Sequence, residues 1–145
     1  MLDYVSKAHQ IAKQAHQGQV DKAGVDYIKH PEMVASFVNG DLEKAAAYLH
    51  DVLEDTDVTT DELKNAKIPN EVIEAVSVLT KQQGRAYFDY LEEVKANKIA
   101  RTVKIADLTH NSDISRLNIV SEKDKQRIEK YQKALAFLKS LKNRY

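Results

Sequence analysis

The chain lacks cysteine and tryptophan, and its 145 residues include only two prolines and four glycines. Without cysteine there can be no disulfide bond, no thiolate-based zinc site and no thiol nucleophile. No apolar run approaches the roughly 20 residues of a membrane span, and the start of the chain lacks the pattern of a signal peptide. Lys plus Arg and Asp plus Glu both number 22, so the charge gives no sign of attraction to nucleic acid or membranes. We therefore expect a cytoplasmic protein without either partner.

Helix-forming residues dominate the sequence, and no segment alternates polar and apolar residues as a strand would. We predict an all-α fold in which residues 1–145 form one compact helical domain. The predicted helices include 31–38, 42–53, 87–96, 99–111 and a long amphipathic helix that begins at Ser121. The apolar side of this last helix suits either the intramolecular core or the interface of a homodimer. That side carries Ile128, Tyr131, Leu135 and Leu138.

The dipeptide His50-Asp51 is the most informative feature of the chain. It lies near the end of segment 42–53, which is apolar on nearly every side and is therefore expected to be buried. A second carboxylate, Asp107, lies on the apolar face of its predicted helix, and His30 stands at a loop-to-helix junction. A single buried histidine is usually just hydrogen-bonded. Buried charges need compensation, however, and one divalent metal ion bound by these side chains would supply it.

In order and spacing, these residues resemble the signature of the HD-domain superfamily of metal-dependent phosphohydrolases. Further stretches resemble the hydrolase domain of the RelA/SpoT-type stringent-response enzymes and of their small stand-alone relatives. These stretches are 15–19, 24–31, 49–56, 80–81 and 103–111. The resemblance implies an HD-domain helical bundle around one divalent metal ion, usually Mn²⁺. It also implies that the ligands of this ion are His30, His50, Asp51 and Asp107.

The same resemblance assigns Glu54 and Asp55 to the acidic pair that prepares the attacking water, and Asn111 to a contact with the sugar. The spacing agrees, because in a continuous helix Glu54 lies on the same face as His50. The alternative for the acidic pair is a solvated helix end, although acidic groups there oppose the helix dipole. The alternative for Asn111 is a helix C-cap. His110 is expected beside the ligands or the substrate.

Departures from the family pattern fall at positions that the resemblance assigns to substrate binding. Where the hydrolases carry Arg-Lys-Ser this chain has Asp21-Lys22-Ala23, and Leu108 and Asp113 replace two further arginines. A substrate with two diphosphates favours arginine and lysine around it. The remaining candidates for substrate binding are Lys22, Lys81, Arg101 and Lys104, together with Asn111.

Three functions remain open on this evidence. The first is a (p)ppGpp 3′-pyrophosphohydrolase, in which metal-activated water releases pyrophosphate. The second is an HD phosphohydrolase that acts on another nucleotide or phosphate ester by the same mechanism. The third is a non-catalytic, metal-stabilised module that binds a nucleotide or a partner protein. The presence of both Glu54 and Asp55 argues against the third, because a structural metal site does not need them.

Overall fold

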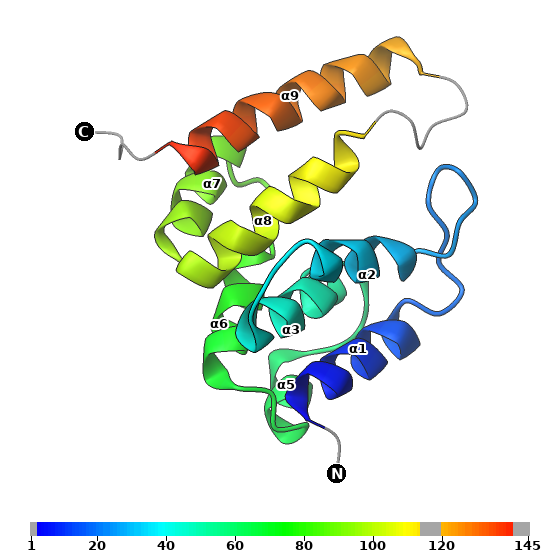
Figure 1. Cartoon of the computed structure of the whole chain (residues 1–145), viewed down its shortest axis with the longest axis vertical. Helices are drawn as coiled ribbons and strands as arrows, with labels where there is room; N and C mark the ends of the chain where they lie inside the picture. The colour runs from blue at the N-terminus through cyan, green and yellow to red at the C-terminus, as the bar shows by residue number, and fades with distance from the viewer. Residues whose placement is uncertain (1–2, 114–119, 141–145) are drawn as a thin grey trace.

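The computed structural model describes residues 3–113 and 120–140. These residues form helices joined by turns and loops (Figure 1), and the only strand-like pairing among them is an isolated antiparallel bridge between Val20 and Asp26. The predicted all-α fold is confirmed. The helices are α1 (Tyr4–Ala15), α2 (Lys29–Ser36), α3 (Asp41–Leu49), α4 (Val52–Asp55), α5 (Thr60–Asn65), α6 (Asn70–Leu79), α7 (Tyr87–Ala96), α8 (Lys98–Asn111) and α9 (Glu122–Lys139).

Helix α3 lies at the centre of the molecule, where it packs against α1, α2, α6 and α8 (Figure 1). Its residues Ala45, Ala46, Ala47 and Leu49 have no solvent-exposed surface. The C-terminal half of α3 is apolar, and this composition fits its burial, because polar side chains there would lose their contacts with water. The C-terminal end of α3 is therefore enclosed by other helices, and polar groups there must find partners inside the protein.

The predicted continuous helix over 42–53 is wrong. Helix α3 ends at Leu49, and α4 starts only at Val52. The His50 ring explains the break, because its Nδ1 lies 2.6 Å from the carbonyl oxygen of Ala47. In an unbroken helix that oxygen would accept the backbone N–H of Asp51. The two residues of the His-Asp pair thus occupy a turn between two helices.

Helix α2 begins at Lys29, two residues before the predicted start at Pro31, and ends at Ser36. Proline is tolerated there because it falls in the first turn, where a backbone N–H has no partner within the helix. The loop before α2 runs over 17–28 and turns at Gly24, whose φ of +81° favours glycine.

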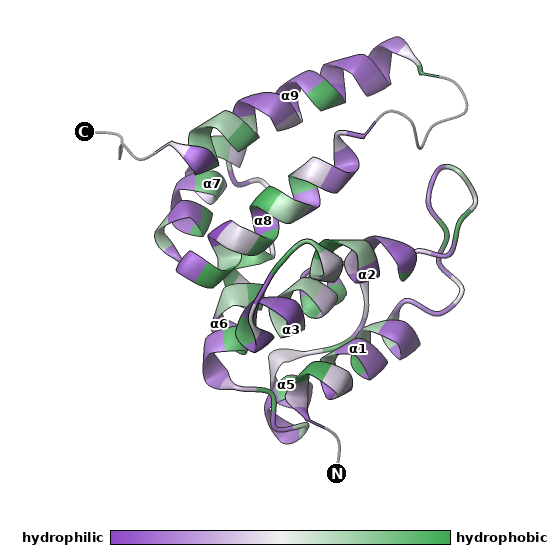
Figure 2. Ribbon diagram, in the orientation of Figure 1, coloured by the Kyte–Doolittle hydropathy of each residue, from purple (hydrophilic) through white to green (hydrophobic). Residues whose placement is uncertain are grey.

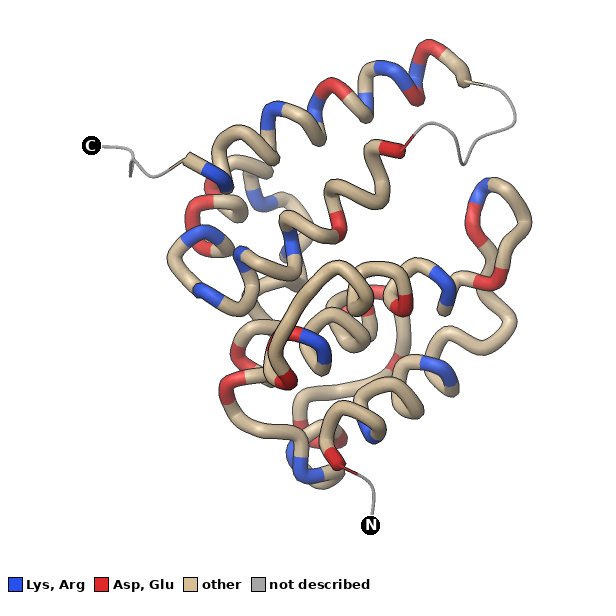
Figure 3. Tube along the Cα trace, viewed as in Figure 1, with Lys and Arg blue, Asp and Glu red and all other residues tan. Residues whose placement is uncertain are grey.

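Helix α9 starts where the sequence predicts, since Ser121 and Asp124 form a reciprocal capping box. It packs against α7 and α8, and its Ala134 and Leu138 are buried. Figure 2 shows hydrophilic residues along most of α9 and more hydrophobic ones near its C-terminal end, beside α7. Lysines and arginines are interspersed with acids along it (Figure 3). The apolar side of α9 therefore contributes to the intramolecular core, and a homodimer through this helix stays a prediction.

In residues 3–113 and 120–140, none of the helices combines the length and the apolar composition that a transmembrane segment needs.

Candidate active site

A buried cluster of two histidines and one carboxylate joins three helices. His30 comes from α2, His50 follows the last residue of α3, and Asp107 comes from α8; each is at most 5% exposed. One ligand atom from each residue lies within 4.8 Å of those of the other two. The Oδ1 atom of Asp107 is 2.7 Å from His30 Nε2 and 3.4 Å from His50 Nε2. These are the donor types that divalent transition metals bind, and their atoms are close enough to share one ion.

The protonation of His50 supports a cation at this point. Its Nδ1 must carry a proton, because its partner, the Ala47 carbonyl, can only accept. The second ring nitrogen, Nε2, is buried as well. It faces carboxylate oxygens of Asp51 at 3.0 Å and of Asp107 at 3.4 Å. Burial lowers the pKa of His50, but these two charges outweigh burial and raise it well above its usual value.

His30 is oriented by a second histidine. Its Nδ1 lies 2.7 Å from Nδ1 of His110, and the two rings are stacked with centroids 5.0 Å apart. One of these nitrogens must donate. Nε2 of His30 lies 2.7 Å from Asp107 Oδ1, which only accepts, so Nε2 donates to it; a metal ion would take the place of that proton. His110 therefore lies beside the cluster, as the sequence led us to expect.

Two predicted substrate residues contact Asp107 itself. Lys104 Nζ lies 3.0 Å from Oδ2, and Asn111 Nδ2 donates to Oδ1 at 3.0 Å. Burial raises the pKa of Asp107, but the charge of Lys104 and hydrogen bonds from the histidines outweigh burial and lower it well below its usual value. Lys104 and Asn111 thus keep the carboxylate ionised and oriented.

Asp51 lies at the edge of the cluster, with its side chain 21% exposed. Tyr27 donates its hydroxyl proton to Asp51 Oδ2. Burial and the charge of Asp51 both raise the pKa of Tyr27, so it stays protonated and donates. Burial raises the pKa of Asp51, but the charge of His50 outweighs burial and lowers it to about 2. Sequence reasoning missed Tyr27 as a site residue; its position three residues before His30 was the available signal.

The acidic pair lies on α4, beside the cluster and open to solvent. Glu54 Oε1 accepts the backbone N–H of Lys81 at 2.9 Å. Partial burial raises the pKa of Glu54, and partial burial together with the charge of Asp51 raises that of Asp55. Carboxylates with a raised pKa are better proton acceptors.

A pocket of about 220 Å³ lies between the 21–23 loop, the end of α8 and α9. Asn111 connects this pocket to the cluster, because it lines the pocket and also donates to Asp107. Two cationic side chains line the pocket, Lys22 and Arg127. Lys22 Nζ lies 3.5 Å and Arg127 Nη2 2.5 Å from Oδ1 of Asp124. The lining residues are Asp21, Lys22, Ala23, Asn111, Asp113, Arg127 and Tyr131.

The pocket contains residues that sequence reasoning missed or placed elsewhere. Arg127 was not a candidate, and Tyr131 was assigned to the apolar side of the last helix. Their spacing of four residues on one helix was the available signal. Of the remaining candidates, Arg101 reaches the Ser140 carbonyl at 3.4 Å and does not join the cluster. Lys81 contacts Glu54 only through its backbone.

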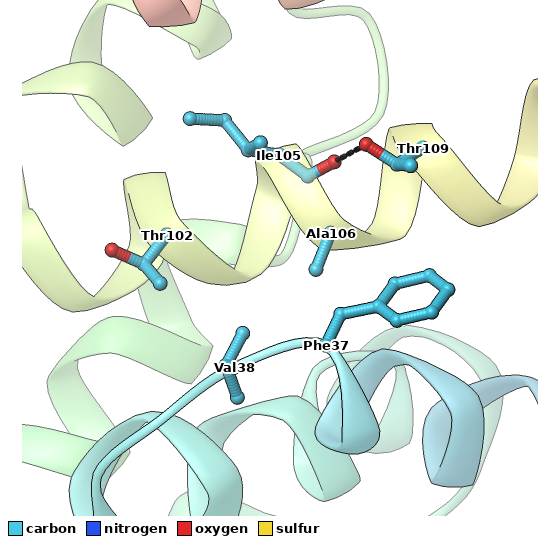
Figure 4. A pocket seen from close by; sticks show the side chains of 6 residues that line it. All are labelled: Phe37, Val38, Thr102, Ile105, Ala106 and Thr109. Carbon is cyan, nitrogen blue, oxygen red and sulfur yellow. Dashed lines mark hydrogen bonds between the residues drawn. The ribbon is translucent and has the colours of Figure 1, made fainter.

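An apolar groove of about 450 Å³ lies on another side of α8 (Figure 4). Phe37 and Val38 face Ala106 across it. The hydroxyl of Thr109 is used within the helix, where it donates to the Ile105 carbonyl at 2.7 Å. The Thr102 hydroxyl likewise donates to the Lys98 carbonyl at 3.1 Å, and the other lining side chains are apolar, in contrast to the pocket beside Asn111.

Comparison with known proteins identifies relatives of this chain. No family model matches it. It is 38% identical over 70% of its length to the guanosine-3′,5′-bis(diphosphate) 3′-pyrophosphohydrolase of Haemophilus influenzae. It is 35% identical over 72% of its length to the bifunctional (p)ppGpp synthase/hydrolase SpoT of Escherichia coli. The chain spans only 17% of each of these proteins.

A solved structure shares the fold. A metazoan ortholog of SpoT that hydrolyses ppGpp superimposes with a TM-score of 0.78, at 19% sequence identity. The match covers 99% of this chain and 89% of that one. The predicted resemblance in sequence and the predicted helical architecture are both confirmed.

Proposed function

We propose that this chain, a relative of the RelA/SpoT-type enzymes, is a metal-dependent phosphohydrolase that releases pyrophosphate from the 3′ position of (p)ppGpp. The observation that carries the proposal is a buried group of His30, His50 and Asp107 ligand atoms, within 4.8 Å of one another, in a chain similar to enzymes of that name.

His30, His50, Asp51 and Asp107 would hold one divalent ion, which we propose to be Mn²⁺. The donor set of imidazole and carboxylate suits such an ion. Nε2 of His50 is buried between two carboxylates, where a divalent cation would take the place of the second proton of the ring. The chemistry supplied by the bound ion is a lower pKa of water and neutralisation of a phosphoryl oxygen.

The acidic pair handles the proton. Glu54 or Asp55 accepts it from the attacking water, as their raised pKa values favour. Water oxygen bonds to the phosphorus attached to the 3′ oxygen, and the bond between that phosphorus and the 3′ oxygen breaks. The acid then returns a proton to the leaving 3′ oxygen. The products from ppGpp are GDP and pyrophosphate, which balances one water against one broken ester bond.

The pocket beside Asn111 is the proposed substrate pocket. Lys22 and Arg127 supply positive charge there for an anionic group of the nucleotide. Asp124 pairs with both cations in the structure. A substrate phosphate would therefore either displace Asp124 from these cations or bind to them beside it. Lys81, whose backbone N–H donates to Glu54, remains a further candidate for contact with a phosphate of the substrate.

A second candidate function follows from the acids in the same pocket. Asp21 and Asp113 line it at positions where the related hydrolases carry arginine. Two carboxylates beside two cations leave the lining without the positive excess expected for a substrate with two diphosphates. A less highly charged nucleotide or phosphate ester, cleaved by the same machinery, is the alternative substrate class.

The decisive experiment is to incubate Mn²⁺-loaded protein with ppGpp and to quantify GDP and pyrophosphate. We expect prompt release that the Asp51→Ala variant loses and that Asp57→Ala, an exposed acid nearby, retains. No release by folded, metal-loaded protein would contradict the (p)ppGpp assignment. The same assay on other nucleotides and phosphate esters then tests the alternative. If all of them stay intact, the result favours the non-catalytic binding module.

A further inference from the structure

His16 is a buried titratable residue that the proposed mechanism leaves unused. It follows the last residue of α1 and is only 2% exposed. Its ring lies near that of Tyr27, with centroids 4.9 Å apart, and Tyr27 donates to Asp51. A buried imidazole is normally hydrogen-bonded, so the partners of its two ring nitrogens determine its role.

The side chain of Gln19 determines where His16 carries its proton. Gln19 Nε2 donates to the backbone carbonyl of Asp55 at 3.2 Å, which orients the amide. Its Oε1 then faces His16 Nδ1 at 3.0 Å. Because an amide oxygen only accepts, Nδ1 is the protonated nitrogen. His16 Nε2 is buried without a hydrogen-bond partner, so a second proton there would have no acceptor. His16 therefore presents an Nδ1–H group to Gln19.

The resulting chain of hydrogen bonds ends on the acidic pair. Asp55 is the last residue of α4, which has four residues and is too short to be stable by itself. Each member of the pair receives one hydrogen bond from outside this helix. Glu54 receives it from the backbone of Lys81, and the carbonyl of Asp55 receives it from Gln19.

We propose that His16 and Gln19 are positioning residues that hold the end of α4, and with it the carboxylate of Asp55, in place for the attacking water. The proposal rests on the proposed function, which assigns Asp55 to the acidic pair. His16 fixes the amide of Gln19, and Gln19 fixes the Asp55 backbone. Neither residue lines the proposed substrate pocket beside Asn111. Their effect is therefore on turnover and not on substrate or metal binding.

The first test uses Gln19→Glu, which keeps the shape of the side chain but replaces the donor to Asp55 with a carboxylate oxygen. We expect kcat on ppGpp to fall at least about tenfold, as for a misplaced catalytic group, with KM and Mn²⁺ affinity unchanged. Gln17→Glu adds the same charge at an exposed position two residues away and should leave kcat unchanged. Equal kcat in Gln19→Glu and Gln17→Glu would overturn the proposal.

Variants of His16 test which nitrogen matters. Asparagine places an N–H near the position of Nδ1, whereas glutamine places its amide near Nε2. We expect His16→Asn to retain most of the kcat and His16→Gln to lose it. The double variant His16→Gln/Gln19→Glu should be no slower than either single variant, because both break one chain of hydrogen bonds. The proposal would be contradicted if His16→Gln kept its kcat while His16→Asn lost it. It would also be contradicted if the losses of kcat in the two single variants added up in the double variant.

An NMR measurement separates this proposal from the proposed function. Imidazole ¹⁵N shifts of the metal-free wild type should show His16 as the Nδ1–H tautomer. The carbonyl ¹³C resonance of Asp55 should move in Gln19→Glu and stay in place in Gln17→Glu. If the wild type fails to cleave ppGpp while these shifts appear, the function is wrong and the hydrogen-bond chain stands. An Nε2–H tautomer, or an unmoved Asp55 resonance, overturns the positioning role itself.

Discussion

At the scale of single residues, the site depends on which groups donate and which accept. Lys104 and Asn111 donate to Asp107, and Tyr27 donates to Asp51. These donors leave each carboxylate ionised, which is the state that a metal ligand needs. Removing one donor should therefore weaken metal binding without changing the ligands themselves.

Replacement of Tyr27 by phenylalanine tests this at Asp51. The ring still packs, but Asp51 loses the hydroxyl donor that orients it. We expect the affinity for Mn²⁺ to fall about tenfold or more, the range found for partners of metal ligands. Isothermal titration with Mn²⁺ measures the change, and Tyr4→Phe on α1 serves as control. An unaltered affinity would show that Tyr27 does not hold Asp51 for the metal.

Replacement of Lys104 by methionine removes the positive charge beside Asp107. The side chain of Lys104 is 16% exposed, and the loss leaves a buried carboxylate with less compensation. We expect the unfolding free energy of the metal-free protein to fall by about 3 kcal/mol, and added Mn²⁺ to restore part of the loss. Urea unfolding measures both effects. Lys98→Met, at an exposed position on the same helix, should change neither, and equal stability of the two variants would argue against the pairing.

At the scale of elements, the ends of helices carry the function. The break between α3 and α4 turns His50 and Asp51 into the interior, and it results from the bond between the His50 ring and the Ala47 carbonyl. The start of α9 is secured by Asp124, which pairs with Ser121, Lys22 and Arg127. Through the last two contacts, α9 also forms a wall of the proposed substrate pocket.

The contacts of Asp124 predict a pH dependence. Hydrogen bonds from Ser121, with Lys22 nearby, lower the pKa of Asp124 from 3.8 to about 2. A lowered pKa in the folded state means that the stabilisation is complete above pH 3.8 and is lost as the pH falls towards 2. The stability difference between wild type and Asp124→Asn should therefore shrink over that range. Urea midpoints from pH 5 to pH 2 measure it, and a constant difference would contradict the assignment.

At the scale of the whole molecule, the cluster connects segments that are far apart in the sequence. His30, His50 and Asp107 come from α2, the end of α3 and α8, which pack against one another (Figure 1). A ligand that binds only the folded state stabilises the whole fold, since the unfolded chain does not assemble the site.

Metal removal should consequently lower global stability. We expect Mn²⁺ at about 100 times its Kd to add about 2.7 kcal/mol to the unfolding free energy, and a chelator to reverse the gain. Differential scanning calorimetry with and without Mn²⁺ measures it. His50→Ala should show no metal-dependent shift, whereas His9→Ala, at a partly exposed histidine, should shift like the wild type. A metal-independent wild type would argue against a resident ion.

The sequence by itself determined the helical fold and most helix positions. The period of apolar residues and the capping residues are local signals, so α7 and α9 begin where the sequence predicts. It also directed attention to His30, His50, Asp51 and Asp107, because charges in apolar surroundings are conspicuous in a sequence.

Only the tertiary structure decided how these residues meet. The break after Leu49, the donor role of Tyr27, and the positions of Arg127 and Tyr131 in a pocket all depend on contacts between distant segments. Lys104 reaches Asp107, whereas Arg101 on the same helix does not. This difference follows from how α8 is rotated against its neighbours. Helical period predicts which residues share a face, but the packing of helices determines what that face contacts.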